Sequence, residues 1–289
     1  MTTSTAPALS QADTRDRVPV HTIAPSRSWA PLRLREIWEY RELLYFLVWR
    51  EIKVRYKQTA LGVAWAVIQP LFTMVVFSIF FGRLAGLPSD GVPYPVFAYC
   101  ALLPWQLFAF ALTESSNSVV ANQRLITKVY FPRLIMPLAA VCVGLADFAI
   151  SFVVLLALMA YYGIAPGLAA WTVPAWAALA VLTALSVGLW LSALNVRYRD
   201  IRYTIPFLTQ VWLFATPVAY ATTMIPEGWR TVYALNPMVG VVDGFRWALL
   251  GTVAWPGPTV FVSMGAVAVL LVSGLFYFRR MERTFADVV

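Results

Sequence analysis

The stretch Leu134–Tyr162 reads LIMPLAAVCVGLADFAISFVVLLALMAYY, and Asp147 is its one charged residue. A helix needs about 20 consecutive apolar residues to cross a bilayer, because the hydrocarbon core is about 30 Å thick and a helix rises about 1.5 Å per residue. The stretch exceeds that length, so it can cross a membrane with some tilt. It therefore predicts a membrane-spanning helix.

Five further apolar segments surround this one, at residues 61–82, 96–115, 173–194, 204–222 and 258–278. The chain of 289 residues is 60% hydrophobic and 12% charged, with a mean hydropathy of +0.70. A soluble domain carries about 25% charged residues. Pro206 and Pro217 predict kinks in the fifth segment. We expect an all-α integral membrane protein with six transmembrane helices.

The distribution of positive charge predicts how these spans are oriented. Segments 1–60, 116–133, 195–203 and the tail from residue 279 hold most of the 22 Lys and Arg residues. The intervening loops hold only Arg83, Arg230 and Arg246. The positive-inside rule places the first group, and with it both termini, in the cytoplasm. This topology accounts for the net charge of +8 without a nucleic-acid partner.

A second kind of helix is expected at residues 31–58, before the first span. Its apolar side chains recur at helical spacing, with Trp38 and Trp49 suited to the membrane interface. Its cations fall on a different face: Arg50, Lys53 and Lys57. The pattern fits either a lipid anchor or a docking surface for a cytosolic partner. Residues 1–30 are expected to be a disordered cytoplasmic tail without a signal peptide, residues 59–283 the transmembrane domain, and residues 284–289 a cytoplasmic tail.

Between the fifth and sixth spans, Asn236–Gly251 is apolar but too short to cross a bilayer. Asn236 suits a helix N-cap, Pro237 the first turn, and Gly251 the residue after the last turn. These signals predict a short re-entrant or interfacial helix on the outer side. Asp243 and Arg246 lie three residues apart, so they can pair on one helix face.

Few residues could carry chemistry. The sequence contains no GxxxxGK[ST] nucleotide loop, no zinc-ligand spacing and no GxSxG elbow, and its one histidine, His21, lies in the tail. We therefore expect no catalytic residues and no metal site. Cys100 and Cys142 are interpreted as buried small apolar residues. A carboxylate inside a span is either functional or held by a structural partner, and for Asp147 both remain open.

Several aromatic and amide side chains could line a transport pathway, where sugar rings stack on aromatic faces and amides bind hydroxyls. The candidates are Gln69, Phe72, Gln210, Trp212 and Tyr220. A secondary transporter would show inverted repeats and several ionisable groups within the spans, and a membrane-embedded transferase would need a histidine or paired carboxylates. The sequence favours neither class.

Five stretches resemble the permease subunits of type-2 ABC exporters that move polysaccharides such as O-antigen, capsule or teichoic acid. They are REIKVRYKQTALGVAWAVIQPL (Arg50–Leu71), NQRLITKVYFPRLIMP (Asn122–Pro137), LNVRYRDIRY (Leu194–Tyr203), TPVAY (Thr216–Tyr220) and LNPM (Leu235–Met238). The similarity runs from about residue 31 to residue 283. A type-2 exporter of lipids or drugs is the alternative within the same class.

The resemblance implies a homodimer in the bacterial inner membrane, bound to two copies of a separate ABC ATPase that holds the ATP and Mg. This chain would then carry no cofactor, and the substrate would be a lipid-linked glycan. The segment Asn122–Arg133 would be a coupling helix docked on the ATPase. Its contact residues would be Arg124, Leu125, Ile126, Lys128, Val129 and Tyr130, with Arg50, Lys53 and Lys57 clamping the same partner. Residues 237–251 would gate the outer mouth, with Asn236, Asp243 and Arg246 as gate candidates.

Overall fold

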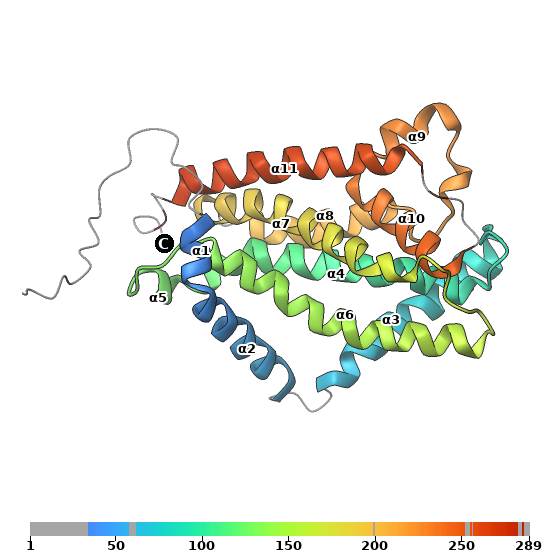
Figure 1. Ribbon diagram of the computed structural model, residues 1–289, viewed down its shortest axis with the longest axis horizontal. Coiled ribbons are helices and arrows are strands. Elements are labelled where there is room, and N and C mark those ends of the chain that lie inside the picture. The colour runs from blue at the N-terminus through green and yellow to red at the C-terminus, as the bar shows by residue number, and fades with distance from the viewer. Residues whose placement is uncertain are drawn as a thin grey trace, which may run out of the picture. The chain divides into compact units, whose positions relative to one another are not determined.

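The structure is a computed structural model that describes residues 34–57, 62–198, 200–251, 255, 257–282 and 285. The described residues are helical or irregular, without strands (Figure 1). The elements are α1 (Leu34–Glu39), α2 (Arg41–Lys57), α3 (Gly62–Phe77), η1 (Ser78–Leu84), α4 (Tyr94–Ala121), α5 (Gln123–Ile126), α6 (Ile135–Tyr161), η2 (Ala170–Thr172), α7 (Val173–Arg197), α8 (Ile201–Phe214), η3 (Thr222–Met224), α9 (Glu227–Tyr233), α10 (Pro237–Leu250) and α11 (Thr259–Met281). The predicted tails 1–30 and 284–289 lie outside the described residues, except for Phe285.

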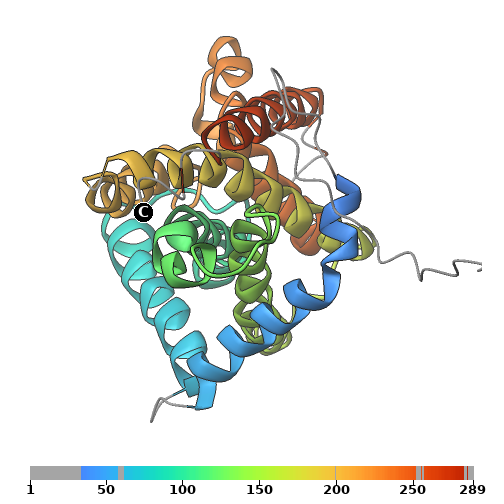
Figure 2. The same ribbon diagram turned by 90° about the vertical axis from the view of Figure 1, so that its left-hand side faces the viewer.

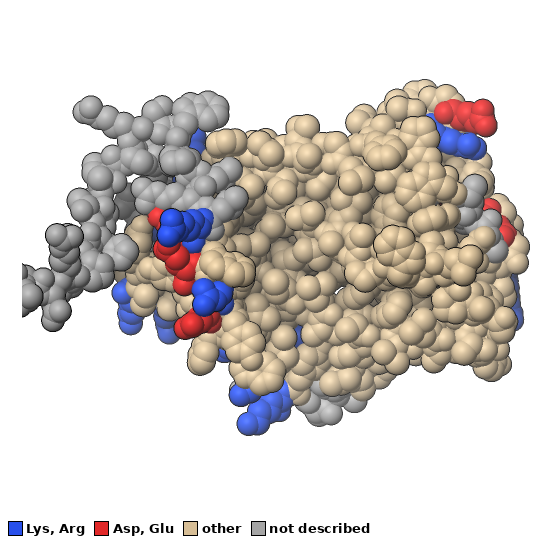
Figure 3. Space-filling model, viewed as in Figure 1, with Lys and Arg blue, Asp and Glu red and all other residues tan. Residues whose placement is uncertain are grey.

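Five of the six predicted spans are confirmed as helices that are long and apolar enough to cross a membrane. They are Val63–Leu84, Tyr94–Ala121, Ile135–Tyr161, Ala170–Arg197 and Thr259–Met281. On the face seen in Figure 3, charged side chains gather over α1 and α2 at one end and near α9 at the other, with a broad uncharged band between them. This distribution fits helices whose middle portions face hydrocarbon.

The predicted span 204–222 is not confirmed. Its helix, α8, has 14 residues, which corresponds to a rise of about 21 Å, short of the hydrocarbon thickness. The helix stops because Thr216 precedes Pro217, and a residue before proline avoids the helical conformation. The chain then turns through residues 215–221 instead of continuing as a helix.

Helix α4 forms the centre of the bundle, with α3, α6, α7, α8 and α10 packed around it (Figures 1 and 2). Most of its length is buried, including Phe97, Phe108 and Leu112. Small residues allow the neighbours to approach closely: a Cβ at Gly144 on α6 would lie 2.8 Å from the Phe110 ring. Such contacts between small residues and large side chains drive helix association in lipid, where the hydrophobic effect gives little.

The predicted amphipathic helix consists of two helices, α1 and α2, separated at Tyr40. Leu47 is buried against the core, and α2 packs mainly on α6. Trp38 and Trp49 are exposed, 71% and 45% respectively, as expected of side chains that contact lipid headgroups. The sequence did not predict the break between α1 and α2.

A short helix, α10, is confirmed in the predicted stretch Asn236–Gly251, with the predicted end signals. The Asn236 side chain accepts a hydrogen bond from the Met238 N–H at 3.1 Å, and Gly251 takes a left-handed conformation with φ of 66°. Nearly every residue of α10 is buried, against α4, α7 and α11. How deeply α10 enters a membrane stays a prediction.

Candidate functional site

The predicted coupling segment lies at the same end of the bundle as α1 (Figure 1). Only one turn of it, α5, is a regular helix, followed by a hydrogen-bonded turn in which the Val129 N–H donates to the Leu125 carbonyl at 3.0 Å. Ile126 is buried in the core and Leu125 packs against it, so neither offers an open surface. The exposed residues include the cations Arg124 and Lys128, the polar Gln123 and Thr127, and Val129 and Tyr130. The segment thus presents a small apolar surface together with two cations.

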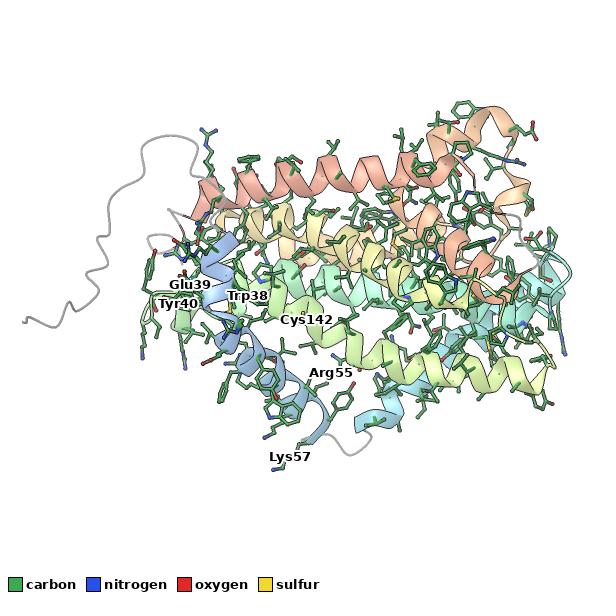
Figure 4. All side chains as sticks on the ribbon, in the orientation of Figure 1. Trp38, Glu39, Tyr40, Arg55, Lys57 and Cys142 are labelled. Atoms are coloured by element: carbon green, nitrogen blue, oxygen red, sulfur yellow. The ribbon has the colours of Figure 1, made fainter. Side chains whose placement is uncertain are left out.

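Helix α2 is joined to this segment by Arg50. Its guanidinium donates to Oδ1 of Asn122 at 3.2 Å and pairs with Glu51 at 2.6 Å. The ammonium of Lys53 lies 5.0 Å from the centre of the Trp49 ring, and the exposed Lys57 ends the helix (Figure 4). Of the three predicted cations of α2, only Arg50 therefore contacts the coupling segment.

Asp147 is held by two consecutive residues of α2. Its carboxylate pairs with the Arg55 guanidinium at 2.6 Å and accepts a hydrogen bond from the Tyr56 hydroxyl. The Arg55 guanidinium also lies 4.4 Å from the centre of the Phe110 ring, and Figure 4 shows Arg55 on the side of α2 that faces α6. Burial is the main cause that raises the pKa of Tyr56, and the hydrogen bond to Asp147 is the second. The phenol therefore keeps its proton and remains a hydrogen-bond donor. Arg55 and Tyr56 are thus structural partners of Asp147, and a role of the carboxylate in transport stays a prediction.

A cavity of about 310 Å³ opens beside this pair, between α2, α3, α4 and α6. Its polar lining includes Gln69, Gln106 and Glu114. A second cavity of about 200 Å³ shares Arg55 and Glu114 with the first. Gln69 and Asp147, which the sequence nominated separately, thus lie on one cavity. Sequence reasoning did not assign Arg55 to this site, and it interpreted Glu114 as a residue at a helix end near the lipid headgroups, although a carboxylate within an apolar segment was a signal.

The other pathway candidates fall into two groups. Trp212, Asn236 and Tyr220 lie where α8 ends and α10 begins: the Trp212 indole N–H donates to Asn236 Oδ1 at 2.9 Å, and the Tyr220 hydroxyl lies 2.7 Å from that of Tyr233. Asn236 also donates to the Ala215 carbonyl at 2.9 Å, so it ties the end of α8 to the start of α10. The remaining candidates, Phe72 on α3 and Gln210 on α8, are exposed.

Arg246 and Asp243 of α10 are buried but do not form an ion pair within 4.0 Å. The Arg246 guanidinium donates to the carbonyls of Val218 at 3.0 Å and Tyr220 at 3.2 Å, and lies 3.6 Å from the centre of the Phe97 ring. Asp243 accepts from the Thr222 hydroxyl at 2.6 Å. The expected pairing between the two is therefore wrong.

Burial sets the electrostatics of these two residues. It raises the pKa of Asp243 and lowers the pKa of Arg246, because each charged form loses its hydration. Arg246 fastens α10 to the turn that follows α8, because it donates to two carbonyls of that turn. Asp243 fastens α10 to the next element, η3, through the hydroxyl of Thr222.

Comparison with known proteins gives the site its context. The family model described as "ABC-2 type transporter" matches residues 42–250. The O-antigen export system permease protein RfbA of Myxococcus xanthus is 31% identical over 255 residues, which cover 86% of this chain and 96% of that protein. A Klebsiella pneumoniae protein of the same name is also 31% identical, over 86% of this chain and 95% of its own length. The polysialic acid transport protein KpsM of Escherichia coli is 24% identical, over 81% of this chain and 91% of its own length.

The matched region begins within α2 and ends at the last residue of α10, so it contains Asp147, the coupling segment and Arg246. The helical bundle with five membrane-spanning candidates agrees with a transport protein. Because the family model matches most of the chain, this protein belongs to the ABC-2 type transporter family.

Proposed function

We propose that the chain is the permease subunit of an ATP-driven exporter that moves a lipid-linked polysaccharide across the bacterial cytoplasmic membrane. The observation that carries this proposal is the similarity to O-antigen export permeases along nearly their whole length. The weaker similarity to a polysialic acid transport protein supports a glycan substrate in general more than one particular glycan.

A separate ATPase supplies the energy in this proposal. The sequence has no nucleotide-binding loop of its own, and an exposed surface suited to a partner lies in the coupling segment. Val129 and Tyr130 are 52% and 73% exposed and follow the exposed cations Arg124 and Lys128 in the chain. Exposed apolar and aromatic side chains together with charged ones are the usual composition of a protein interface. ATP and Mg bind to that partner, and this end of the bundle faces the cytoplasm.

A homodimer completes the pathway. Gln69 and Gln210 are exposed on α3 and α8, and an amide that faces hydrocarbon without a partner costs several kcal/mol, roughly 4–8 in fully apolar surroundings. A second copy packed beside these helices would enclose a polar channel in which both amides bind water or sugar hydroxyls. Differential affinity of the ATPase for the closed and open dimers then drives the opening.

Purification of the tagged chain from bacterial membranes tests the proposal. The expected result is an ATP-binding subunit in equal stoichiometry, and intracellular accumulation of the lipid-linked polymer when the permease is depleted. Deleting residues 124–130 should leave the protein in the membrane but separate ATP hydrolysis from export. If the chain purifies alone and its depletion leaves surface glycan unchanged, the exporter assignment is wrong. Export of a lipid without a glycan would favour the alternative within the family.

A further inference from the structure

The C-terminal end of α11 makes contacts that neither the spans nor the coupling segment explain. One carboxylate oxygen of Glu282 accepts the backbone N–H of Arg133 at 3.1 Å, and the other accepts from the Arg279 guanidinium at 2.7 Å. The Arg133 guanidinium in turn donates to the Glu282 carbonyl. One acidic residue thus links the last turn of α11 to the end of the coupling segment.

Two further contacts extend this link. Arg279 also pairs with Glu36 of α1 at 3.5 Å. The Arg133 guanidinium lies 5.8 Å from the centre of the Phe285 ring, which is fully buried and packs edge-on against Phe278. The sequence analysis used Arg133 and Arg279 only as positive charges that indicate membrane topology. The structure shows that both take part in this one cluster.

The cluster is protected enough from water to have an energetic effect. The side chains of Glu282 and Arg279 are 14% and 20% exposed, whereas the ion pair between Glu227 and Arg230 on α9 involves a carboxylate that is 89% exposed. Exposed pairs contribute little because water and salt screen them, and partly buried, hydrogen-bonded pairs contribute more.

Helix α11 connects this cluster to the outer helix α10. Its 23 residues correspond to a length of about 35 Å. At its outer end the Ser263 hydroxyl donates to the Ala234 carbonyl at 2.8 Å, and a Cβ at Gly240 of α10 would lie 2.8 Å from Ser263. Since packed helices move as rigid bodies, a shift at one end of α11 reaches the other.

We propose that Glu282 is a positioning residue for energy coupling, which holds the coupling segment to α11 so that the two move together. This inference rests on the proposed function, because it needs an ATPase docked at Val129 and Tyr130. Arg133 lies only two residues before α6, and α5 is a single turn, so the coupling segment has little rigidity of its own. The bonds to Glu282 supply that rigidity and give the ATPase a direct connection to α10.

The test uses the complete complex of permease and ATPase in reconstituted vesicles. Three quantities are measured: copurification of the ATPase, the rate of ATP hydrolysis, and the amount of glycan exported per ATP hydrolysed. For Glu282→Ala we expect copurification and hydrolysis to stay within about 2-fold of the native complex, and export per ATP to fall between about 2-fold and 30-fold. Glu282→Gln keeps an oxygen that can accept from Arg133 but loses its charge, so its loss should be smaller.

Two comparisons separate positioning from general damage. Glu227→Ala removes a glutamate from an exposed ion pair at the other end of the bundle and should leave all three quantities unchanged. Arg133→Ala removes the guanidinium that donates to the Glu282 carbonyl but keeps the backbone N–H, so it breaks the other of the two bonds. The double variant breaks both bonds and should therefore lose more export per ATP than either single variant. If Glu282→Ala does not accumulate in membranes, the cycle is run with Glu282→Gln and Arg133→Lys.

Native export per ATP in Glu282→Ala, or in the double variant that breaks both bonds, would overturn the inference. Failure of the native chain to copurify with an ATPase would instead refute the proposed function, so the two failures are distinguishable.

Discussion

Replacing Asp147 with alanine should release the end of α2 from the bundle. The carboxylate holds two neighbouring side chains of α2, Arg55 and Tyr56, and α2 otherwise has one buried residue, Leu47. The residues that follow Lys57 lie outside the described part of the chain. The two bonds to Asp147 should therefore dominate the local stability of residues 50–57.

The size of the effect follows from the exposure of each partner. A hydrogen bond to a charged group contributes about 1.5–3 kcal/mol, and the Tyr56 bond is only partly buried, so we take about 1.5–2. The Arg55 side chain is 40% exposed, and solvent screening reduces its ion pair to about 0.5–1 kcal/mol. The sum of about 2–3 kcal/mol corresponds to an opening equilibrium of α2 that rises about 30-fold to 160-fold.

Hydrogen exchange of the backbone amides of α2, measured on the protein in nanodiscs, reports this opening directly. Exchange over residues 50–57 should accelerate by that factor in Asp147→Ala and by about 10-fold to 30-fold in Tyr56→Phe. Glu51→Ala is the matched control. It breaks a pair in which both side chains are 45% exposed, so the acceleration should stay below about 5-fold.

Exchange in Asp147→Ala no faster than in Glu51→Ala would refute this reasoning and show that the contacts to Asp147 contribute no stability. Asp147→Asn then separates a structural from a functional carboxylate, because the amide oxygen can still accept from Tyr56. Lost export with near-native exchange of α2 in Asp147→Asn would point to a transport role for the charge. If Asp147→Asn both lowers export and accelerates the exchange of α2, the carboxylate has a structural role.

Three predictions concern α10. A Cβ at Gly244 would lie 2.4 Å from the Trp176 ring, so Gly244→Ala should destabilise the protein by about 1–3 kcal/mol. Thermal unfolding measures this loss, and an unchanged midpoint temperature would show that the Trp176 ring can move away. Arg246→Met leaves the buried carbonyls of Val218 and Tyr220 without their donor, which should cost about 1–3 kcal/mol for each carbonyl. A loss near zero would contradict the assigned bonds. Burial raises the pKa of Asp243 above its ordinary value of 3.8, so native stability falls as pH rises from that value through the raised pKa. Asp243→Asn should therefore gain relative stability as pH rises over this range, and a difference that stays constant with pH would argue against the shift.

Local signals in the sequence were enough to place most helices. The apolar runs at 61–82 and 134–162 are confirmed as helices that can span a bilayer, since lipid demands about 20 apolar residues whatever surrounds them. The Asn236 cap and the left-handed Gly251 are confirmed as well, because caps depend on a few adjacent residues. The span 204–222 is not confirmed, because its helix ends before the proline at 217, a local signal that hydropathy does not include.

Contacts between distant segments could not be foreseen in this way. Asp147 was identified as an isolated charge, but its partners come from a helix about 90 residues earlier, and which face of α2 meets α6 depends on how both helices pack. Nothing in the sequence near Glu282 indicates its partner, because its carboxylate accepts a hydrogen bond from the backbone N–H of Arg133, 149 positions earlier. Arg246 was expected to bind the nearest acid on its own helix.

The sequence by itself determined that the chain is a membrane protein with helices at known positions and no nucleotide-binding loop, because hydropathy, charge bias and motifs are properties of short stretches. Tertiary structure decided which charges are held and by what. Asp147 is held by α2, Arg246 by backbone carbonyls, and Glu282 by the coupling segment. A buried charge takes whichever donor or acceptor the packing of the helices brings within about 3 Å, and that distance is not encoded in sequence spacing.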